Sequence, residues 1–413
     1  MARGADAGGL APVRLVELEL DRPPQALAGL EDYVAVEALV RRRGAPVAWV
    51  RLPVVDGTCP ARTVAEALAG LANQPADPLT EPAPASVWPS VTVAVCTRDR
   101  TEDLARCLDS LARLDHPAHE VLVVDNAPTT DDTRILVERR GGAVRYVREP
   151  RPGLDWARNR AIAEAMGDVV AFTDDDALVD PCWVRALAGV FAGDPSVAAV
   201  TGLVLPAELD TEAQVLFERY RSFGRGFQRR RVAATDGTGP LATRYGLAGD
   251  YGTGANMAFR RAVFDRIGPF DPALDVGTPA RGGGDLEMFF RVLKEGHALV
   301  YEPSAIVRHR HRRTLPELQR QIADHGISFS AYVVRSGLAY REERLAFARL
   351  ACWWYAKTAF RVLLPKAAPA GALRSLGLAE LRGCVTGLGR YPAARRAAAR
   401  VAADHSIERA RHE

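Results

Sequence analysis

Lysine is nearly absent from this sequence, with Lys294, Lys357 and Lys366 the only three in 413 residues. Arginine therefore carries almost all of the positive charge, and 54 Lys and Arg against 51 Asp and Glu leave a formal net charge of +3 at pH 7. A chain so close to neutrality has no overall field that would attract nucleic acid. The composition therefore predicts that nucleic acid is not a partner.

The sequence also lacks the patterns that mark an exported or membrane-spanning chain. Its six cysteines form no Cys-x-x-Cys pair, which favours ordinary buried thiols in a reducing compartment. The stretch Met1–Gly9 has no apolar core of the signal-peptide kind, and no run of 18 consecutive apolar residues occurs that could form a transmembrane helix. We therefore expect a cytoplasmic protein, with peripheral contact at the inner face of a membrane as an alternative.

Proline marks the clearest boundary in a chain that is long enough for two or three domains. Segment 74–90 carries Pro75, Pro78, Pro82, Pro84 and Pro89, which predict a stiff linker. Before it, strand-like and helical stretches predict a small α+β domain over residues 1–73, for which no motif indicates a role. After it, we expect a larger domain over 91–315 and a helical region over 316–413.

From Val91 onward, strand and helix patterns alternate. Short apolar runs at 91–96, 121–124, 144–147 and 169–172 are separated by helical patterns, which predicts a mainly parallel α/β sheet. Polar residues follow three of these runs, at Thr97–Asp99, Asp125 and Asp174–Asp176. Because open α/β sheets bind ligands at the carboxyl ends of their strands, we expect these residues to share one site.

Three consecutive carboxylates, Asp174, Asp175 and Asp176, follow the buried strand at 169–172. Like charges side by side repel one another unless a cation lies among them. Carboxylate oxygens suit Mg²⁺ or Mn²⁺, ions that commonly take a substrate's phosphates as further ligands. Taken alone, the triad is equally well explained as a solvated acidic turn that caps the next helix, so the surrounding motifs have to decide.

Several motifs between residues 91 and 315, taken in order, resemble those of family 2 glycosyltransferases, the inverting enzymes of the GT-A fold. The matching stretches are Val93–Asp99, Val123–Asn126, Gly153–Asn159, Thr173–Asp176, Gly252–Ala258 and Gly284–Glu287, followed by His309. The resemblance implies a Rossmann-like, mostly parallel sheet that binds a nucleotide-diphosphate sugar. Residues 1–73 and the helical extension after 315 lie outside it.

The resemblance also implies a role for individual side chains. Asp285 would be the catalytic base, and Asp125 would face the nucleobase of the donor. The residues implied on the donor side are Thr97, Arg98, Asp125, Arg158, Asn159, Asp174 and Asp175. Those implied on the acceptor side are Gly254, Ala255, Asn256 and Glu287, and those implied at the metal are Asp174, Asp176 and His309.

Two positions depart from the family's pattern. Asp155 stands where many members have a small hydroxyl residue, and Gly284 stands where the base motif begins with Glu. No role is carried over to Asp155. The register of the base motif stays open between Asp285 and Glu287.

The implied chemistry is transfer of a sugar from a nucleotide-sugar donor to an acceptor hydroxyl. A divalent ion, Mg²⁺ or Mn²⁺, would stabilise the departing diphosphate, and Asp285 would take the hydroxyl proton. The acceptor could be a glycan, a lipid-linked sugar or a small molecule. Neither the sugar, the nucleobase nor the oligomeric state follows from the sequence.

Three other classes of protein stay as alternatives. A phosphatase with an aspartate nucleophile expects Asp-x-Asp after the first strand of its sheet, whereas here it follows the fourth. A nucleotidylyltransferase expects a glycine-rich loop after strand one, and Cys96–Arg100 contains no glycine. A non-catalytic nucleotide-sugar-binding module on the same fold would be favoured if the acidic triad bound no metal.

Single residues also have simpler explanations. Asp285 could merely cap a helix, Asp125 could be a turn residue, and His309 lies in a basic cluster that could be solvated. The six arginines between Arg219 and Arg231 fit a solvated loop as well as a clamp for phosphates of a lipid-linked acceptor. The apolar stretch 345–364 has no single charged face, so we expect it to pack on the larger domain, with contact at a membrane surface as the alternative.

Overall fold

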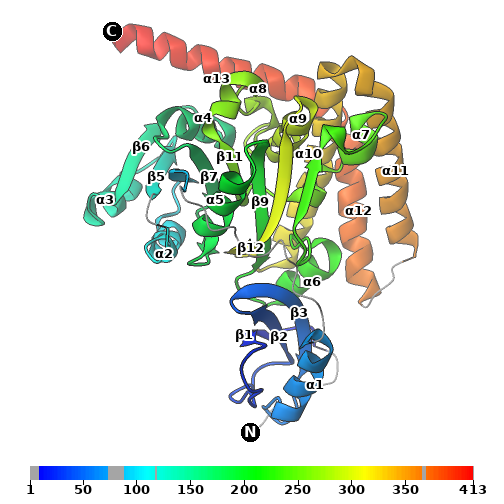
Figure 1. Ribbon diagram of the computed structural model, residues 1–413. Helices are drawn as coiled ribbons and strands as arrows, with labels where there is room; N and C mark the ends of the chain where they lie inside the picture. Colours follow the sequence, from blue (N-terminus) through cyan, green and yellow to red (C-terminus); the bar gives the residue numbers. More distant parts are fainter. Residues whose placement is uncertain (1–8, 73–87, 117–118, 365–368, 413) are drawn as a thin grey trace.

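The computed structural model describes residues 9–72, 88–116, 119–364 and 369–412 (Figure 1). Its N-terminal unit consists of β1 (Val13–Glu19), β2 (Ala35–Arg42), β3 (Ala45–Pro53) and α1 (Ala61–Ala72). β1 lies parallel to β2, and β2 forms a hairpin with β3 through Arg43 and Gly44, both at positive φ. Two such residues give the turn whose twist matches that of paired strands. Most of the predicted linker, up to residue 87, lies outside the described residues.

The N-terminal unit has a core of its own and also packs on the larger domain. Val36, Val40 and Leu52 are buried within the unit, against α1. At its outer edge, the Val13 amide donates to the Leu209 carbonyl oxygen over 2.8 Å, and Arg41 Nη2 lies 2.6 Å from Asp180 Oδ2. The unit is therefore held to the larger domain by backbone, charged and apolar contacts.

The larger domain is built on one sheet with the strand order β10-β12-β9-β11-β7-β4-β5-β6, and β8 pairs with β12. The strands are β4 (Val91–Thr97), β5 (His119–Asn126), β6 (Val144–Glu149), β7 (Val169–Asp174), β8 (Ala177–Val179), β9 (Val197–Pro206), β10 (Arg230–Ala233), β11 (Asn256–Arg260) and β12 (Ala298–His309). β7, β4, β5 and β6 are parallel, as the alternating pattern predicts. β11 lies antiparallel between β7 and β9, so the whole sheet is mixed.

Helices cover both faces of this sheet, and each strand contributes alternate side chains to the two cores that these helices form with it. In β4, Val91, Val93 and Val95 belong to one core and Ala94 to the other, because successive side chains of a strand point to opposite faces. The first face is covered by α2 (Thr101–Leu111), α3 (Asp132–Arg139) and α5 (Trp183–Gly193), and the second by α4 (Leu154–Glu164), α7 (Leu241–Tyr245), α8 (Phe264–Ile267) and α9 (Gly284–Lys294). α6 (Glu212–Arg221) packs against the C-terminal helices.

The C-terminal helices are α10 (Leu315–Ala339), α11 (Arg344–Leu363), α12 (Ala370–Gly387) and α13 (Arg390–His412). The backbones of α10 and α12 approach each other closely at Gly383. A Cβ at this position would lie 2.1 Å from the carbonyl oxygen of Ala323, so only a glycine fits. α11 contributes Phe347, Ala351 and Trp354 to the core of the larger domain, as expected for 345–364. α13 extends along one edge of the molecule (Figure 1). Within the described residues, no helix has both the length and the apolar character needed to cross a membrane.

Candidate active site

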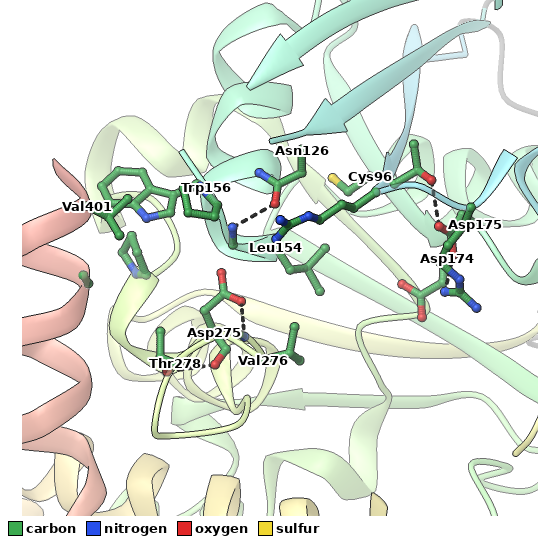
Figure 2. Close-up of a pocket in the computed structure, with 18 of the residues that line it drawn as sticks. Cys96, Asn126, Leu154, Trp156, Asp174, Asp175, Asp275, Val276, Thr278 and Val401 are labelled. Atoms are coloured by element: carbon green, nitrogen blue, oxygen red, sulfur yellow. Dashed lines mark hydrogen bonds and ion pairs between the residues drawn. The ribbon is translucent and has the colours of Figure 1, made fainter. Parts of the chain in front are cut away.

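Two adjoining cavities lie where β4, β5 and β7 end. The first has a volume of about 500 Å³ and is lined by the ends of β4 and β7, by Asn126 and by the loop that leads into α4 (Figure 2). The second, of about 260 Å³, is lined by Thr253–Ala255, Arg158 and the start of α9. Leu154, Asp174, Val276, His309 and Arg312 line both cavities. This is the sheet edge at which the sequence predicts a ligand site.

Strand pairing brings the acidic triad next to His309. β7 ends at Asp174, and the chain then turns into β8, whose Ala177 pairs with His309 of the antiparallel β12. His309 Nε2 consequently lies 3.2 Å from Asp176 Oδ1 and 3.8 Å from Asp174 Oδ2. The predicted metal residues, Asp174, Asp176 and His309, therefore come together although His309 lies more than 130 positions after the two aspartates in the chain.

The ionisation of this cluster is set by burial and by the charges within it. Burial and the neighbouring Asp176 raise the pKa of Asp174. Burial opposes ionisation of Asp176 too, but the hydrogen bond and charge of His309, with Arg100, lower the pKa of Asp176. Burial disfavours the imidazolium, yet the bond to Asp176 and the charges of both aspartates raise the pKa of His309. The repulsion between Asp174 and Asp176 is therefore one that a bound cation would relieve.

The donor atoms of this cluster fit a hard divalent ion. One ligand atom from each of Asp174, Asp176 and His309 can be chosen so that all lie within 4.8 Å of one another. Two carboxylates with one imidazole suit Mn²⁺ or Mg²⁺ better than the soft metals that select thiolates. Asp174, Asp176 and His309 therefore form a candidate metal site.

Asp175, predicted to contact the donor, lines the first cavity and is held there by neighbouring side chains. Thr97 Oγ1 donates to its Oδ2 over 2.8 Å, and Arg100 Nη1 donates to its Oδ1 over 2.7 Å. Burial, partly offset by Arg100, raises the pKa of Asp175 to about 7. Arg100 also bonds Asp176 over 2.8 Å. Arg100, which the sequence analysis did not single out, thus ties the end of β4 to the metal cluster, while Thr97 and Arg98 line the first cavity.

Asp125 does not line either cavity, although its neighbour Asn126 lines the first. The Asp125 side chain is buried and accepts a hydrogen bond from the Tyr146 hydroxyl over 2.9 Å, and burial raises its pKa. Asn126 accepts from the Gly153 amide over 2.8 Å and donates to the Arg151 carbonyl over 2.8 Å. Direct contact between Asp125 and a nucleobase stays a prediction, and the structure adds Asn126 as the residue that lines the cavity there.

The Gly153–Asn159 stretch forms the start of α4 and serves two different purposes. Arg158 lines the second cavity while 7 % exposed, and its Nη1 donates to Asp155 Oδ1 over 3.0 Å. Asn159 bonds both the amide and the carbonyl of Phe270, over 2.8 and 2.9 Å. Arg158 is therefore placed to contact a ligand, whereas Asn159 fixes the loop before Asp275.

The two positions that depart from the family pattern, Asp155 and Gly284, lie against each other. A Cβ on Gly284 would be only 2.2 Å from Asp155 Oδ2, so the Asp155 carboxylate occupies the space of a side chain at 284. That oxygen has no hydrogen-bond partner among the described residues. Burial, opposed by Arg158 and reinforced by Asp275 and Asp285, raises the pKa of Asp155 well above its ordinary value. The two departures are thus a matched pair in space.

Asp285 lies in the first turn of α9 and lines the second cavity. Its Oδ2 accepts from the Gly254 amide and its Oδ1 from the Leu286 amide, each over 2.9 Å. A Cβ on Gly254 would lie 2.6 Å from Arg158 Nη2, so a glycine allows this close approach. Asp285 is therefore held rigidly beside Arg158, at the cavity that it shares with Asp174.

The other residues predicted on the acceptor side divide into two groups. Gly254 and Ala255 line the second cavity. Asn256 is buried in β11, where its side chain bonds Trp183 and the carbonyls of Leu203 and Ala305. Asn256 therefore cross-links the sheet and does not face a cavity.

Glu287 also lies away from both cavities. It is fully buried, and its carboxylate pairs with Arg291 and with Arg335 Nη1, the latter over 2.5 Å. This placement makes Glu287 the anchor between α9 and α10 and disfavours its predicted contact with an acceptor.

The C-terminal helix α13 completes the wall of the first cavity, which the sequence analysis did not foresee. Ala397, Ala398 and Val401 line it, and Figure 2 shows Val401 on the side of Trp156 and Thr278. The Tyr391 hydroxyl donates to Asp271 Oδ2 over 2.9 Å and fastens α13 to the loop beneath it. Small residues on one face of a helix were the only signal available in the sequence.

Comparison with known proteins agrees with this geometry. Residues 92–268 match the family model described as glycosyl transferase family 2. A solved mannosyltransferase from Pyrobaculum calidifontis, in complex with GDP-Man and Mn²⁺, is 19% identical, covers 78% of this chain and 92% of its own, and superimposes with a TM-score of 0.50. That likeness confirms the GT-A fold implied by the resemblance.

Two curated relatives are similar over the same region. The glucosyl-dolichyl phosphate glucuronosyltransferase of Haloferax volcanii is 25% identical over 238 residues, which are 53% of this chain and 69% of the relative. The pre-mycofactocin glycosyltransferase of Mycobacterium tuberculosis is 26% identical over 248 residues, which are 59% of this chain and 48% of the relative. The match thus spans only about half of the second relative.

Proposed function

Because residues 92–268 place its central domain in glycosyltransferase family 2, we propose that this chain transfers a sugar, with inversion, from a nucleotide-diphosphate donor to an acceptor hydroxyl. The observation that carries the proposal is the shared wall of the two cavities. Asp174 and His309 of the candidate metal site face both cavities, and Asp285 faces the second. A donor diphosphate in the first cavity and an acceptor in the second would therefore meet beside Asp174.

Asp174, Asp176 and His309 would hold the divalent ion. When bound, Mg²⁺ or Mn²⁺ supplies Lewis-acid stabilisation of the charge that develops on a departing diphosphate. Mn²⁺ accompanies GDP-Man in the solved mannosyltransferase, which supports an ion of this kind and a nucleotide-sugar donor here. Thr97 and Arg98 line the cavity beside the cluster and would contact the donor.

Arg158 would supply fixed positive charge next to the reacting centre. Its guanidinium is buried, is oriented by Asp155, and lies over the Phe270 ring at 5.4 Å from the ring centroid. A preoriented cation in a site of low dielectric stabilises developing negative charge without reorganising. Arg312, which lines both cavities, would add a second positive charge.

Asp285 would act as the general base. The acceptor hydroxyl oxygen forms the new bond to the anomeric carbon as the bond from that carbon to the phosphate oxygen breaks. The hydroxyl proton passes to the Asp285 carboxylate, and the electron pair leaves with the nucleoside diphosphate. One displacement at one carbon inverts its configuration. The Gly254 and Leu286 amides hold the carboxylate in place while leaving lone pairs on both oxygens.

Turnover of nucleotide sugars tests this proposal. The full chain would be incubated with a panel of UDP-, GDP- and dTDP-sugars in Mg²⁺, in Mn²⁺ and in EDTA, and release of nucleoside diphosphate would be followed. We expect metal-dependent release from one donor class, even if only by slow hydrolysis without an acceptor. Release that persists unchanged in EDTA would contradict the metal role, and failure of every donor would contradict the proposed function.

A further inference from the structure

A third cavity, of about 220 Å³, lies between the larger domain and the C-terminal helices and shares no lining residue with the two described above. Its walls carry Arg221 at the end of α6, Arg225 in the following loop, and Lys357 and Arg361 on α11. We call it the basic cavity. Its aromatic wall is the indole of Trp354.

Positive charge in the basic cavity exceeds the negative charge available to balance it. Three cationic groups surround the Trp354 ring, with Arg221 at 4.8 Å, Lys357 at 5.4 Å and Arg361 at 5.9 Å from its centroid. Asp250 lines the cavity, and the buried Glu380 lies behind it. Four cations against these two carboxylates leave two positive charges uncompensated.

Part of this charge has a structural explanation. Arg221 Nη1 donates to Glu380 Oε1 over 2.5 Å, and the Tyr220 hydroxyl donates to the other oxygen of that carboxylate. Arg225 donates to three backbone carbonyls, those of Ser222, Gly224 and Gly249. These two arginines help to hold the fold together. Arg361 Nη1 lies 3.9 Å from Glu380 Oε2, whereas Lys357 has no carboxylate within ion-pair distance among the described residues, so the excess charge is clearest at Lys357.

The wall of the basic cavity also carries groups that are incompletely compensated. Trp354 is 7 % exposed, and its Nε1–H has no hydrogen-bond partner within the described part of the chain. Leaving such a group unsatisfied costs free energy. Burial and the charge of Arg361 also lower the pKa of Lys357, which shows that the cation is disfavoured by its surroundings. An anion in the cavity would compensate Lys357 and give Arg361 a second partner.

The outer face of α11 indicates what carries that anion. Trp353, Phe360, Leu363 and the adjoining Leu364 are between 49 % and 69 % exposed. Trp353 and Phe360 are seven positions apart and therefore share a helix face, and Leu364 follows directly after the end of the helix. Lys357 lies at the border of this face, with its Nζ 4.6 Å from the centroid of the Trp353 ring. Exposed apolar side chains beside a cationic cavity match the chemistry of a phospholipid, whose phosphate adjoins acyl chains.

We propose that the basic cavity binds the phosphate of an anionic lipid while the exposed side chains of Trp353, Phe360, Leu363 and Leu364 enter the surface of the bilayer. The sequence analysis considered this helix as a membrane-surface element and disfavoured it because its charges do not gather on one face. The structure places Lys357 and Arg361 together at the cavity, next to the exposed apolar face. The site is independent of the proposed sugar transfer.

Flotation of the full chain with vesicles tests the site. Vesicles of phosphatidylcholine alone would be compared with vesicles that also contain phosphatidylglycerol, for the parent, Lys357→Gln, Trp353→Ser and Arg349→Gln. Arg349 is an exposed residue of the same helix that does not line the cavity, so its variant loses the same charge elsewhere. If the protein were held only by general attraction to an anionic surface, the loss of any one positive charge would weaken vesicle binding about fivefold.

We expect binding that needs phosphatidylglycerol, a loss of about tenfold or more for Lys357→Gln, and a smaller loss for Arg349→Gln. Trp353→Ser should weaken binding to vesicles but not the thermal stabilisation produced by inorganic phosphate alone. Equal losses for Lys357→Gln and Arg349→Gln would overturn the cavity as a binding site. Stabilisation by inorganic phosphate without any vesicle binding would overturn the lipid as its source.

Discussion

The candidate metal site is rich in carboxylates and the basic cavity in cations, and the wall between the second cavity and the basic cavity includes three pairs of consecutive residues. Phe223, Asp285 and Ser328 line the second cavity, while their chain neighbours Ser222, Leu286 and Phe329 line the basic cavity. On the acidic side, Arg100 and His309 compensate the aspartates only in part. On the basic side, Glu380 compensates the arginines only in part. We therefore expect the acidic side to bind a cation and the basic side to bind an anion.

Asp285→Asn should produce the largest effect, a loss in the rate of sugar transfer at the acidic side, without any effect on the basic cavity. Asn keeps the shape of the side chain but cannot accept the proton of the acceptor, and loss of a general base costs on the order of 10²–10⁴-fold in rate. Steady-state turnover with the donor found in the screen measures this loss. Donor binding and vesicle binding should both be retained.

Glu287→Gln is the matched control for that experiment, since Glu287 lies two residues further along α9. Glu287 pairs with Arg291 and Arg335 in a buried site, and breaking such a pair costs about 3–5 kcal/mol of stability. We expect a lower melting temperature with the chemical step largely retained. If Glu287→Gln melts normally but no longer transfers the sugar, while Asp285→Asn remains active, then Glu287 and not Asp285 is the general base.

Asp176→Ala should remove the response to metal. In the parent, a nucleoside diphosphate with Mn²⁺ at a hundredfold excess over Kd should stabilise the folded protein by about 2.7 kcal/mol. This stabilisation should raise the melting temperature. The variant should show little of this shift, because Asp176 is a candidate ligand and also anchors His309 and Arg100. An equal shift in parent and variant would show that the metal is not held by this cluster.

Gly284→Ala should destabilise the protein because Asp155 occupies the space that a side chain at position 284 needs. The new Cβ would lie 2.2 Å from Asp155 Oδ2, and overpacking of this kind costs about 1–3 kcal/mol. Asp155→Ser removes the obstructing carboxylate, so the double variant should be more stable than the sum of the two single changes predicts. Denaturant unfolding of the four proteins measures this coupling. Strict additivity would mean that the two side chains do not compete for the same space.

Lys357→Gln should have the smallest effect on catalysis. Lys357 lies on the basic side of the wall and lines neither cavity of the candidate active site. Transfer to a water-soluble acceptor, or donor hydrolysis, should therefore stay within about twofold of the parent, since the change is a surface substitution remote from the reacting groups. A large loss in this assay would mean that the basic cavity belongs to the catalytic site.

The acidic side could be predicted from the sequence because its residues follow apolar strands, and the order of those strands fixes where they meet. The position of Asp174 and Asp176 at the sheet edge was predicted in this way. His309, which the resemblance implied, lies beside them through the pairing of β12 with β8. The basic cavity could not be predicted, because Arg221 and Lys357 come together only through the packing of α6 and α11 on the larger domain. The same holds for α13, whose Val401 reaches the first cavity through tertiary contacts.

The motif positions do not show which way a side chain points once it is buried. Glu287 and Asn256 follow motif positions, yet their polar groups bond to other parts of the protein within the core. Strand β11 was not predicted, because its five residues, Asn256–Arg260, are too few to show a period. The boundaries at residues 73, 90 and 315 stay proposals. Their test is limited proteolysis, which should cut first within 74–90.

The anomeric configuration of the product tests the central claim most directly. The parent chain would be given the donor identified in the screen, and the sugar first released or transferred would be assigned by proton NMR before it can mutarotate. Single displacement with Asp285 as the base predicts a β product from an α-linked donor, in the parent and, more slowly, in Asp285→Asn. An α product would mean two displacements or a front-face mechanism, and it would contradict the proposed role of Asp285.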